Sequence, residues 1–201
     1  MGSARRAVTR DDIDKLYSRA QSAADHRRAA EQLAAWAEET HPHDRDVSPA
    51  ALLVSAGEHL TAAGDAEGAV VFFRRAVEAG QYVPPDVRCY LHGGLLQAED
   101  VDAARELADE LRRERPIDGD VYRFIGDNYE AAGDLRRAHR WLTMGAQRTL
   151  NEVADGDDVA AEDAPGVLMT RLRVRHALGL RLDDYDSLVA SALLAERQSS
   201  G

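Results

Sequence analysis

Apolar residues recur along most of the chain at the three- and four-residue spacing of amphipathic helices. The clearest case is 121–148, where the pattern predicts two short helices joined by a turn at Gly133. Two helices pack closely when small residues stand where the backbones approach and bulky ones fill the groove beside them. Small residues occur here at suitable intervals, namely Gly126, Gly133, Ala138 and Gly145. We therefore expect this stretch to form a helix pair.

A turn motif occurs at 24–29, 64–69, 99–104 and 133–138, and in each copy an Asp precedes an Ala by four residues. An Asp carboxylate accepts the free N–H groups of a first helical turn. The motif therefore predicts a cap for the second helix of each pair, at Asp25, Asp65, Asp100 and Asp134. The Ala one turn later lets that helix lie close to its partner.

The motif also sets a repeat, because Ala69 precedes Ala104 by 35 residues and Ala104 precedes Ala138 by 34. The same offsets relate further apolar positions, among them Phe73, Ala108 and Leu142. One position departs from the repeat, because His92 stands where the neighbouring repeats have Gly57 and Gly126, although Gly93 and Gly94 lie beside it. We expect the middle repeat to pack in a shifted register.

A helix–turn–helix unit of this length and pattern resembles the tetratricopeptide repeat. The resemblance covers about three to five repeats and is best at 50–148. It implies an all-α fold: a tetratricopeptide-like α-solenoid of antiparallel helix pairs that wind into a right-handed superhelix.

The domain organisation follows from these patterns. We predict a flexible N-terminus at 1–10, a single helical-repeat domain at 11–196 and a frayed tail at 197–201. The helix pairs are expected at about 11–40, 48–80, 85–115, 118–149 and 164–196.

Two segments inside this domain are predicted to lie outside the helices. The polar stretch 41–49 contains two prolines and reads as a linker, with Ser48 and Pro49 beginning the next helix. The stretch 151–163 is acidic and lacks a periodic apolar face, so we expect an exposed loop there. Asp163 and Pro165 then predict the start of the next helix.

The net charge and the cysteine content narrow the range of possible partners and sites. A formal net charge of -11 argues against a nucleic-acid partner, which requires neutralisation of phosphates. Arginine supplies almost all the positive charge and Lys15 is the only lysine, which is typical of a GC-rich, bacterial genome. Cys89 is the only cysteine, so an intramolecular disulfide and a multi-thiolate zinc site are excluded. No signal peptide or membrane span is recognisable, and we expect a cytoplasmic protein.

We expect no catalytic site, cofactor or metal. Cys89 and His92 have the i, i+3 spacing of a nucleophile and its base on a helix, but a buried thiol in the array is the preferred interpretation. His41 and His43 with Asp44 make a weak metal motif, because no further ligand is specified.

The resemblance also implies a binding surface, since the first helices of successive repeats line a concave groove that commonly binds peptides. Transferred to this chain, the groove candidates are Glu58, Tyr90, Gln97, Arg123, Asp127 and Glu130. The lining leans acidic, so the expected ligand is a basic or mixed-charge peptide. A clamp for C-terminal carboxylates is rejected, because only Lys15 and Arg123 could contribute to it.

The leading hypothesis is thus a non-catalytic protein- or peptide-binding scaffold or adaptor. The alternative is a structural or regulatory protein that self-associates into homo-oligomers. Trp141 stands one position off the repeat and is expected to face partly outward, towards another chain or the acidic loop. A third hypothesis is a nucleic-acid-linked regulator that uses the arginines of 171–181, although these are interpreted as a solvated face that balances the acidic loop. On a helix, Arg171 and Arg175 share a face while Arg173 points elsewhere.

Overall fold

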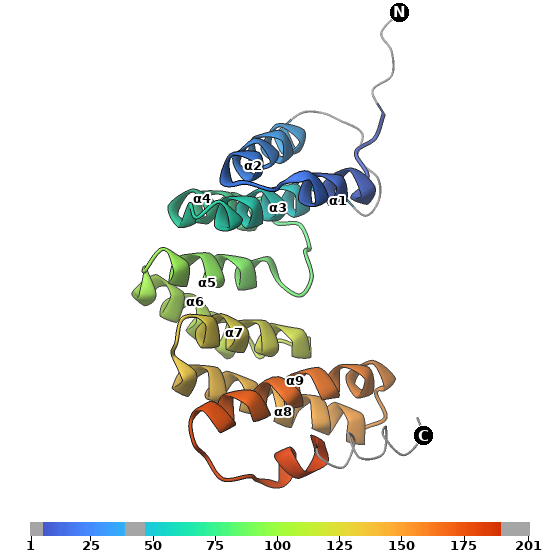
Figure 1. Ribbon diagram of the computed structural model, residues 1–201. Helices are drawn as coiled ribbons and strands as arrows, with labels where there is room; N and C mark the ends of the chain where they lie inside the picture. Colours follow the sequence, from blue (N-terminus) through green and yellow to red (C-terminus); the bar gives the residue numbers. More distant parts are fainter. Residues whose placement is uncertain (1–5, 39–46, 190–201) are drawn as a thin grey trace, which may run out of the picture. The chain divides into compact units, whose positions relative to one another are not determined.

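The computed structural model describes residues 6–38 and 47–189, and this part of the chain is helical without any β-strand (Figure 1). The predicted all-α class is confirmed. The helices with both ends in these residues are α1 Arg10–Arg19, α2 Ala23–Glu38, α3 Pro49–Ala62, α4 Ala66–Glu78, α5 Val87–Gln97, α6 Val101–Glu114, α7 Gly119–Ala131, α8 Leu135–Ala154 and α9 Asp158–Ala177. A further helical stretch covers 184–189.

The chain divides into two compact units, Met1–Leu107 and Ala108–Gly201. The boundary falls within α6, and the predicted domain at 11–196 spans both units. Within 6–38 and 47–189, no helix combines the length and the apolarity needed to cross a membrane.

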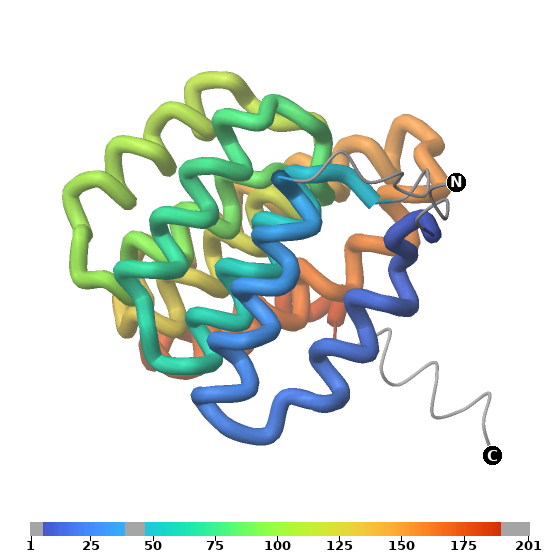
Figure 2. The backbone as a smooth tube through the Cα atoms, turned by 90° about the horizontal axis from the view of Figure 1, so that it is seen from above, coloured from blue at the N-terminus to red at the C-terminus, as the bar shows by residue number. Residues whose placement is uncertain are grey.

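In the first unit, successive helix pairs pack on one another. Helix α3 packs against both α2 and α4, and α5 packs against α4. The first helices of the pairs also meet directly, because α1 contacts α3 and α3 contacts α5. Figure 2 shows these hairpins from above, each with two helices joined by a tight turn. Helices α1, α3 and α5 therefore lie next to one another in this order.

The core of the first unit is built around Phe73 of α4, which is 3 % exposed. A Cβ atom on Gly57 of α3 would lie only 2.4 Å from the Phe73 ring, and one on Gly94 of α5 only 2.8 Å from it. Both helices can approach the ring because these positions lack side chains. In the middle repeat the close approach is thus made by Gly94, two residues after the buried His92.

The predicted caps are confirmed at three of the four turns. Asp65 accepts the N–H of Gly68 at 2.9 Å, Asp134 that of Arg137 at 3.0 Å, and Asp100 that of Ala103 at 3.3 Å. The prediction for Asp25 is wrong, because α2 begins at Ala23. The Ser22 hydroxyl accepts the N–H of Asp25 at 3.2 Å, so the cap is the serine that precedes the helix.

Of two further helix starts, the sequence predicted one correctly and misplaced the other. Ser48 caps α3 as predicted, since its hydroxyl accepts the N–H of Ala51 at 3.1 Å. The predicted flexible N-terminus at 1–10 extends too far, because Val8 is buried and Thr9 caps α1 in a capping box with Asp12. The frayed tail at 197–201 lies outside the described residues.

The second unit contains α8 packed between α7 and α9, and α7 also contacts α9. A Cβ atom on Gly126 of α7 would lie 2.6 Å from Cγ of Leu142, so the small-residue prediction holds for this pair. The prediction for Trp141 is wrong. Its side chain is only 4 % exposed, and its ring packs on Tyr122 with 5.6 Å between centroids.

The predicted acidic loop at 151–163 is also wrong, because α8 continues to Ala154 and α9 begins at Asp158. The Asp157 carboxylate caps α9 by accepting the N–H groups of Val159 and Ala160 at 2.9 and 3.1 Å. The buried face of the early part of α9 consists of alanines, at 160 and 164, which a search for bulky periodic residues misses. Pro165 is therefore an exposed residue inside α9 rather than its start.

Candidate functional site

The first unit carries the relevant side chains on three successive first helices, α1, α3 and α5. The Tyr17 hydroxyl of α1 donates a hydrogen bond to Glu58 Oε2 of α3 at 2.5 Å, and both residues are exposed. Tyr90 of α5 is half-buried, and its hydroxyl donates to the Pro84 carbonyl at 2.8 Å. Sequence reasoning missed Tyr17, because at helical spacing it reads as part of the apolar stripe that includes the buried Ile13.

Tyr90 and Glu58 lie on the neighbouring helices α5 and α3, and the pKa of each is raised. Desolvation raises the pKa of the Tyr90 phenol, and the nearby Glu58 carboxylate raises it further. Desolvation also raises the pKa of Glu58, although the hydrogen bond from Tyr17 opposes this shift. Gln97 is exposed at the C-terminal end of α5, about 10 Å along the helix from Tyr90.

The second unit gathers the other three predicted site residues on α7. Arg123 Nε donates to Asp120 Oδ1 at 2.9 Å, and its Nη1 lies 3.6 Å from Asp127 Oδ2. Arg173 of α9 extends this row, because its Nε donates to Glu130 Oε1 at 2.9 Å. Arg173 Nη2 also lies 3.4 Å from Asp127 Oδ1.

These ion pairs join all three α7 candidates, and Arg173 was not among the predicted site residues. The hydrogen bond to Asp120 raises the pKa of Arg123. Desolvation raises the pKa of Asp127, although Arg123 and Arg173 oppose this shift. The row contains three carboxylates, of Asp120, Asp127 and Glu130, and two guanidinium groups, of Arg123 and Arg173. Five of the six predicted residues thus fall into two groups, one in each unit, and Gln97 lies apart from Tyr90 at the end of α5.

The interpretation of the arginine run of 171–181 as a solvated face is wrong for Arg171 and Arg175, which are buried, whereas Arg173 and Arg181 are exposed. Arg171 is 2 % exposed and donates to Asp183 Oδ2 at 2.6 Å and to Asp186 Oδ1 at 3.1 Å. Arg175 Nε donates to Asp186 Oδ2 at 2.9 Å. As predicted, Arg173 points elsewhere, towards α7.

This ion-pair network joins α9 to the chain that follows it. The hydrogen bond from Arg171 holds the pKa of Asp183 well below its usual range. The Arg171 guanidinium also lies 4.7 Å from the centre of the Tyr185 ring. Arg171 and Arg175 therefore stabilise the fold and are not exposed to bind phosphates.

The candidate nucleophile and metal motifs have different outcomes. Cys89 and His92 are both fully buried, as the packing interpretation predicts. The motif of His41, His43 and Asp44 lies outside the described residues. Among the residues that the structure does describe, no group of three or more His, Cys, Asp or Glu is placed to hold a metal ion.

A buried histidine joins α2 and α3. His59 is fully buried, and its Nδ1 lies 2.8 Å from Nδ1 of the half-buried His26. One ring must donate and the other accept, so the two cannot both be protonated while this bond exists. Tyr17 stacks on His59 with 4.1 Å between ring centroids. Burial, together with His26, lowers the pKa of His59 from 6.5 to about 4.

We expect acid to destabilise the protein well above the range in which carboxylates titrate. The unfolded state binds a proton at His59 below about pH 6.5, while the folded state excludes it until about pH 4. Stability is therefore complete at neutral pH and decreases as the pH falls. For His59 the loss should reach about 2 kcal/mol at about pH 5. Urea unfolding, followed by circular dichroism at several pH values, measures it.

The control separates this effect from other titrations. His59→Gln should reduce the pH dependence between about pH 6.5 and pH 5 by about half, whatever its cost at neutral pH, because burial also lowers the pKa of His92 to about 4 and His92 keeps its own contribution. His176→Gln removes an exposed histidine and should leave the slope unchanged. Equal slopes for the wild type and both variants would contradict the assignment.

Comparison with known proteins adds no family to this description: no protein-family model matches the chain, and neither a curated protein nor a solved structure is significantly similar to it.

Proposed function

We propose that the chain is a non-catalytic protein- or peptide-binding scaffold, a tetratricopeptide-like array whose first helices bind a segment of a partner. One observation carries the proposal: three successive first helices of the first unit contribute aromatic and acidic side chains to neighbouring positions. Tyr17 and Glu58 are exposed and hydrogen-bonded to each other, and Tyr90 is half-buried on α5, the next first helix, which packs against α3.

The chemistry of these groups favours a particular ligand. Tyrosine rings supply apolar contact area at a low cost in side-chain entropy, and their hydroxyl groups can still form hydrogen bonds. The Glu58 carboxylate favours a lysine or arginine beside them. On α7, Asp127 and Glu130 already hold Arg173, which is the kind of side chain we expect a ligand to contribute. A basic or mixed-charge peptide therefore fits both groups.

Two alternatives have less support. The pairing of Cys89 with His92 is fully buried and out of reach of a substrate, which favours binding over catalysis. A nucleic-acid-linked role could not use Arg171 and Arg175 to bind phosphates, because both are buried in ion pairs with aspartates. Self-association is considered separately below.

Peptide binding gives the direct test. We expect a pool of short labelled peptides rich in lysine and arginine to bind more tightly than neutral or acidic pools, measured by fluorescence anisotropy. Glu58→Lys should weaken binding of the basic pool by roughly fivefold to tenfold, about 1–1.4 kcal/mol, because it puts a like charge opposite the ligand.

The matched control is Glu67→Lys, which makes the same charge change at an exposed position on a second helix, α4. It should leave binding within about twofold of the wild type. Equal losses of affinity for Glu58→Lys and Glu67→Lys would show that the effect comes from net charge and not from the position of Glu58. If no peptide pool binds, the groove hypothesis is wrong.

A further inference from the structure

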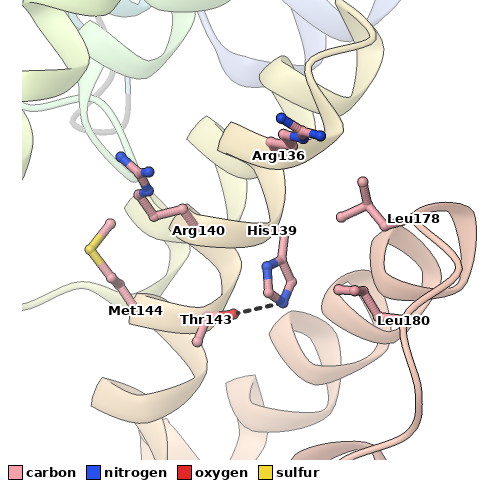
Figure 3. A pocket seen from close by; sticks show the side chains of 7 residues that line it. All are labelled: Arg136, His139, Arg140, Thr143, Met144, Leu178 and Leu180. Carbon is pink, nitrogen blue, oxygen red and sulfur yellow. Dashed lines mark hydrogen bonds between the residues drawn. The ribbon is translucent and has the colours of Figure 1, made fainter.

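The second unit has a hollow between α8 and the end of α9, shown in Figure 3. Its volume is about 570 Å³. Apolar side chains line it at Met144, Leu178 and Leu180. Arg136 and Arg140 stand at its edge, one helical turn apart on α8, and both are exposed. His139 and Thr143 lie deeper and are occupied by bonds to Arg175 and Arg171.

The two arginines at the edge differ from most others in this unit. No carboxylate among residues 6–38 and 47–189 forms an ion pair with Arg136 or Arg140. By contrast, Arg137 between them pairs with the capping Asp134. The hollow thus combines an aliphatic surface with two arginines that no carboxylate of the described residues pairs with, in a chain whose net charge is -11. It is suited to a segment that carries carboxylates beside an aliphatic side chain.

The same unit carries such a segment at the turn between α8 and α9. We call it the acidic turn, 155–159, and it contains Asp155, Asp157, Asp158 and Val159. All its residues are exposed, and Val159 is 68 % exposed. Ile117 borders the same surface depression and is 79 % exposed. Exposed aliphatic side chains next to charges are typical of interaction surfaces.

The hollow and the acidic turn cannot meet within one molecule. Arg140 and Asp155 are separated by the rest of α8, which spans about 22 Å at the rise of an α-helix. The helix is continuous and packs against both α7 and α9, so it holds the two surfaces apart. A contact between them therefore requires two chains.

We propose that the acidic turn of one copy docks into the hollow of a second copy. Asp155 and Asp158 then approach Arg136 and Arg140, while Val159 covers the aliphatic side chains of the hollow. Because the two surfaces differ, the contact is head-to-tail, and its repetition produces oligomers rather than a closed dimer. The docking surfaces are small and the chains repel each other through their net charge, so the association is weak and depends on concentration.

Charge exchange tests this proposal more sharply than added salt, because salt screens both the local pairs and the net repulsion. The measurement is sedimentation velocity on the full chain from about 10 µM to about 1 mM. The wild type should show a mass that rises with concentration. Arg136→Glu with Arg140→Glu, and separately Asp155→Lys with Asp158→Lys, should each sediment as monomer. The second result is diagnostic, because that variant reduces the net repulsion between chains.

A chain that carries all four substitutions has the wild-type net charge and should regain the association. The matched control, Arg27→Glu with Arg74→Glu, makes the same charge change at exposed arginines outside the hollow and should associate about as well as the wild type. Circular dichroism melts verify that each variant is folded. Any one of three results overturns the proposal: the wild type stays monomeric at all concentrations, the four-substitution chain stays monomeric, or the control loses association as completely as the hollow variant does.

Discussion

Asp186→Ala should destabilise the second unit by about 3–5 kcal/mol, the largest effect that we expect from a single charged residue. Asp186 is 3 % exposed and accepts hydrogen bonds from both Arg171 and Arg175. It also accepts the backbone N–H of Asp183 at 3.0 Å, and Asp183 is the residue immediately before the helical stretch 184–189. Alanine would leave two buried guanidinium groups facing one remaining carboxylate, and the loss of compensation costs more than the loss of a contact.

Chemical denaturation of the full chain measures this effect. Asp184→Ala is the matched control, because it removes an exposed aspartate two residues away, and it should change the stability by no more than about 0.5 kcal/mol. If Asp186→Ala were as mild as the control, the network would not be a buried structural element.

Phe73→Ala should destabilise the first unit by about 3–5 kcal/mol, because it leaves a cavity at the centre of the packed helices. Phe73 is 3 % exposed and lies between the backbones of α3 and α5 at Gly57 and Gly94. Neither glycine has a side chain that could fill the space. Val71→Ala, at a 56 % exposed position on the same helix, should cost no more than about 0.5 kcal/mol.

A double-mutant cycle tests the contact itself. Gly57→Ala alone should cost about 1–3 kcal/mol, because its Cβ atom would overlap the Phe73 ring. In the Phe73→Ala background the ring is gone, so Gly57→Ala should cost less than it does alone. Additive effects of the two substitutions would mean that the glycine and the ring do not interact as described.

Much of the helical layout could be predicted from the sequence, because helix formation depends on neighbours within one or two turns. The caps at Asp65 and Asp134 were predictable, since an aspartate placed before a helical run finds its N–H partner locally. The prediction for Asp25 failed for an equally local reason, because Ser22 competes for the same helix end. The acidic stretch 151–163 was misjudged because its buried face is made of alanines.

The candidate site was only partly predictable. Resemblance alone selected Arg123, Asp127 and Glu130 on α7, and the structure adds Arg173 from α9, more than forty residues later in the chain. The pairing of Tyr17 with Glu58 joins α1 to α3 in the same way. Periodicity assigns a residue to a face of its own helix, but it does not identify which helix lies against that face.

The sequence by itself determined that the chain is helical, where most helices begin and which positions are small enough for close packing. Only the tertiary structure decided that Arg171 and Arg175 are buried beside Asp186 instead of forming a solvated basic face, and that Trp141 is in the core. The physical reason is the range of the interactions. Caps and amphipathic spacing act over a few residues, whereas burial and ion pairing depend on which distant residues the folded chain brings together.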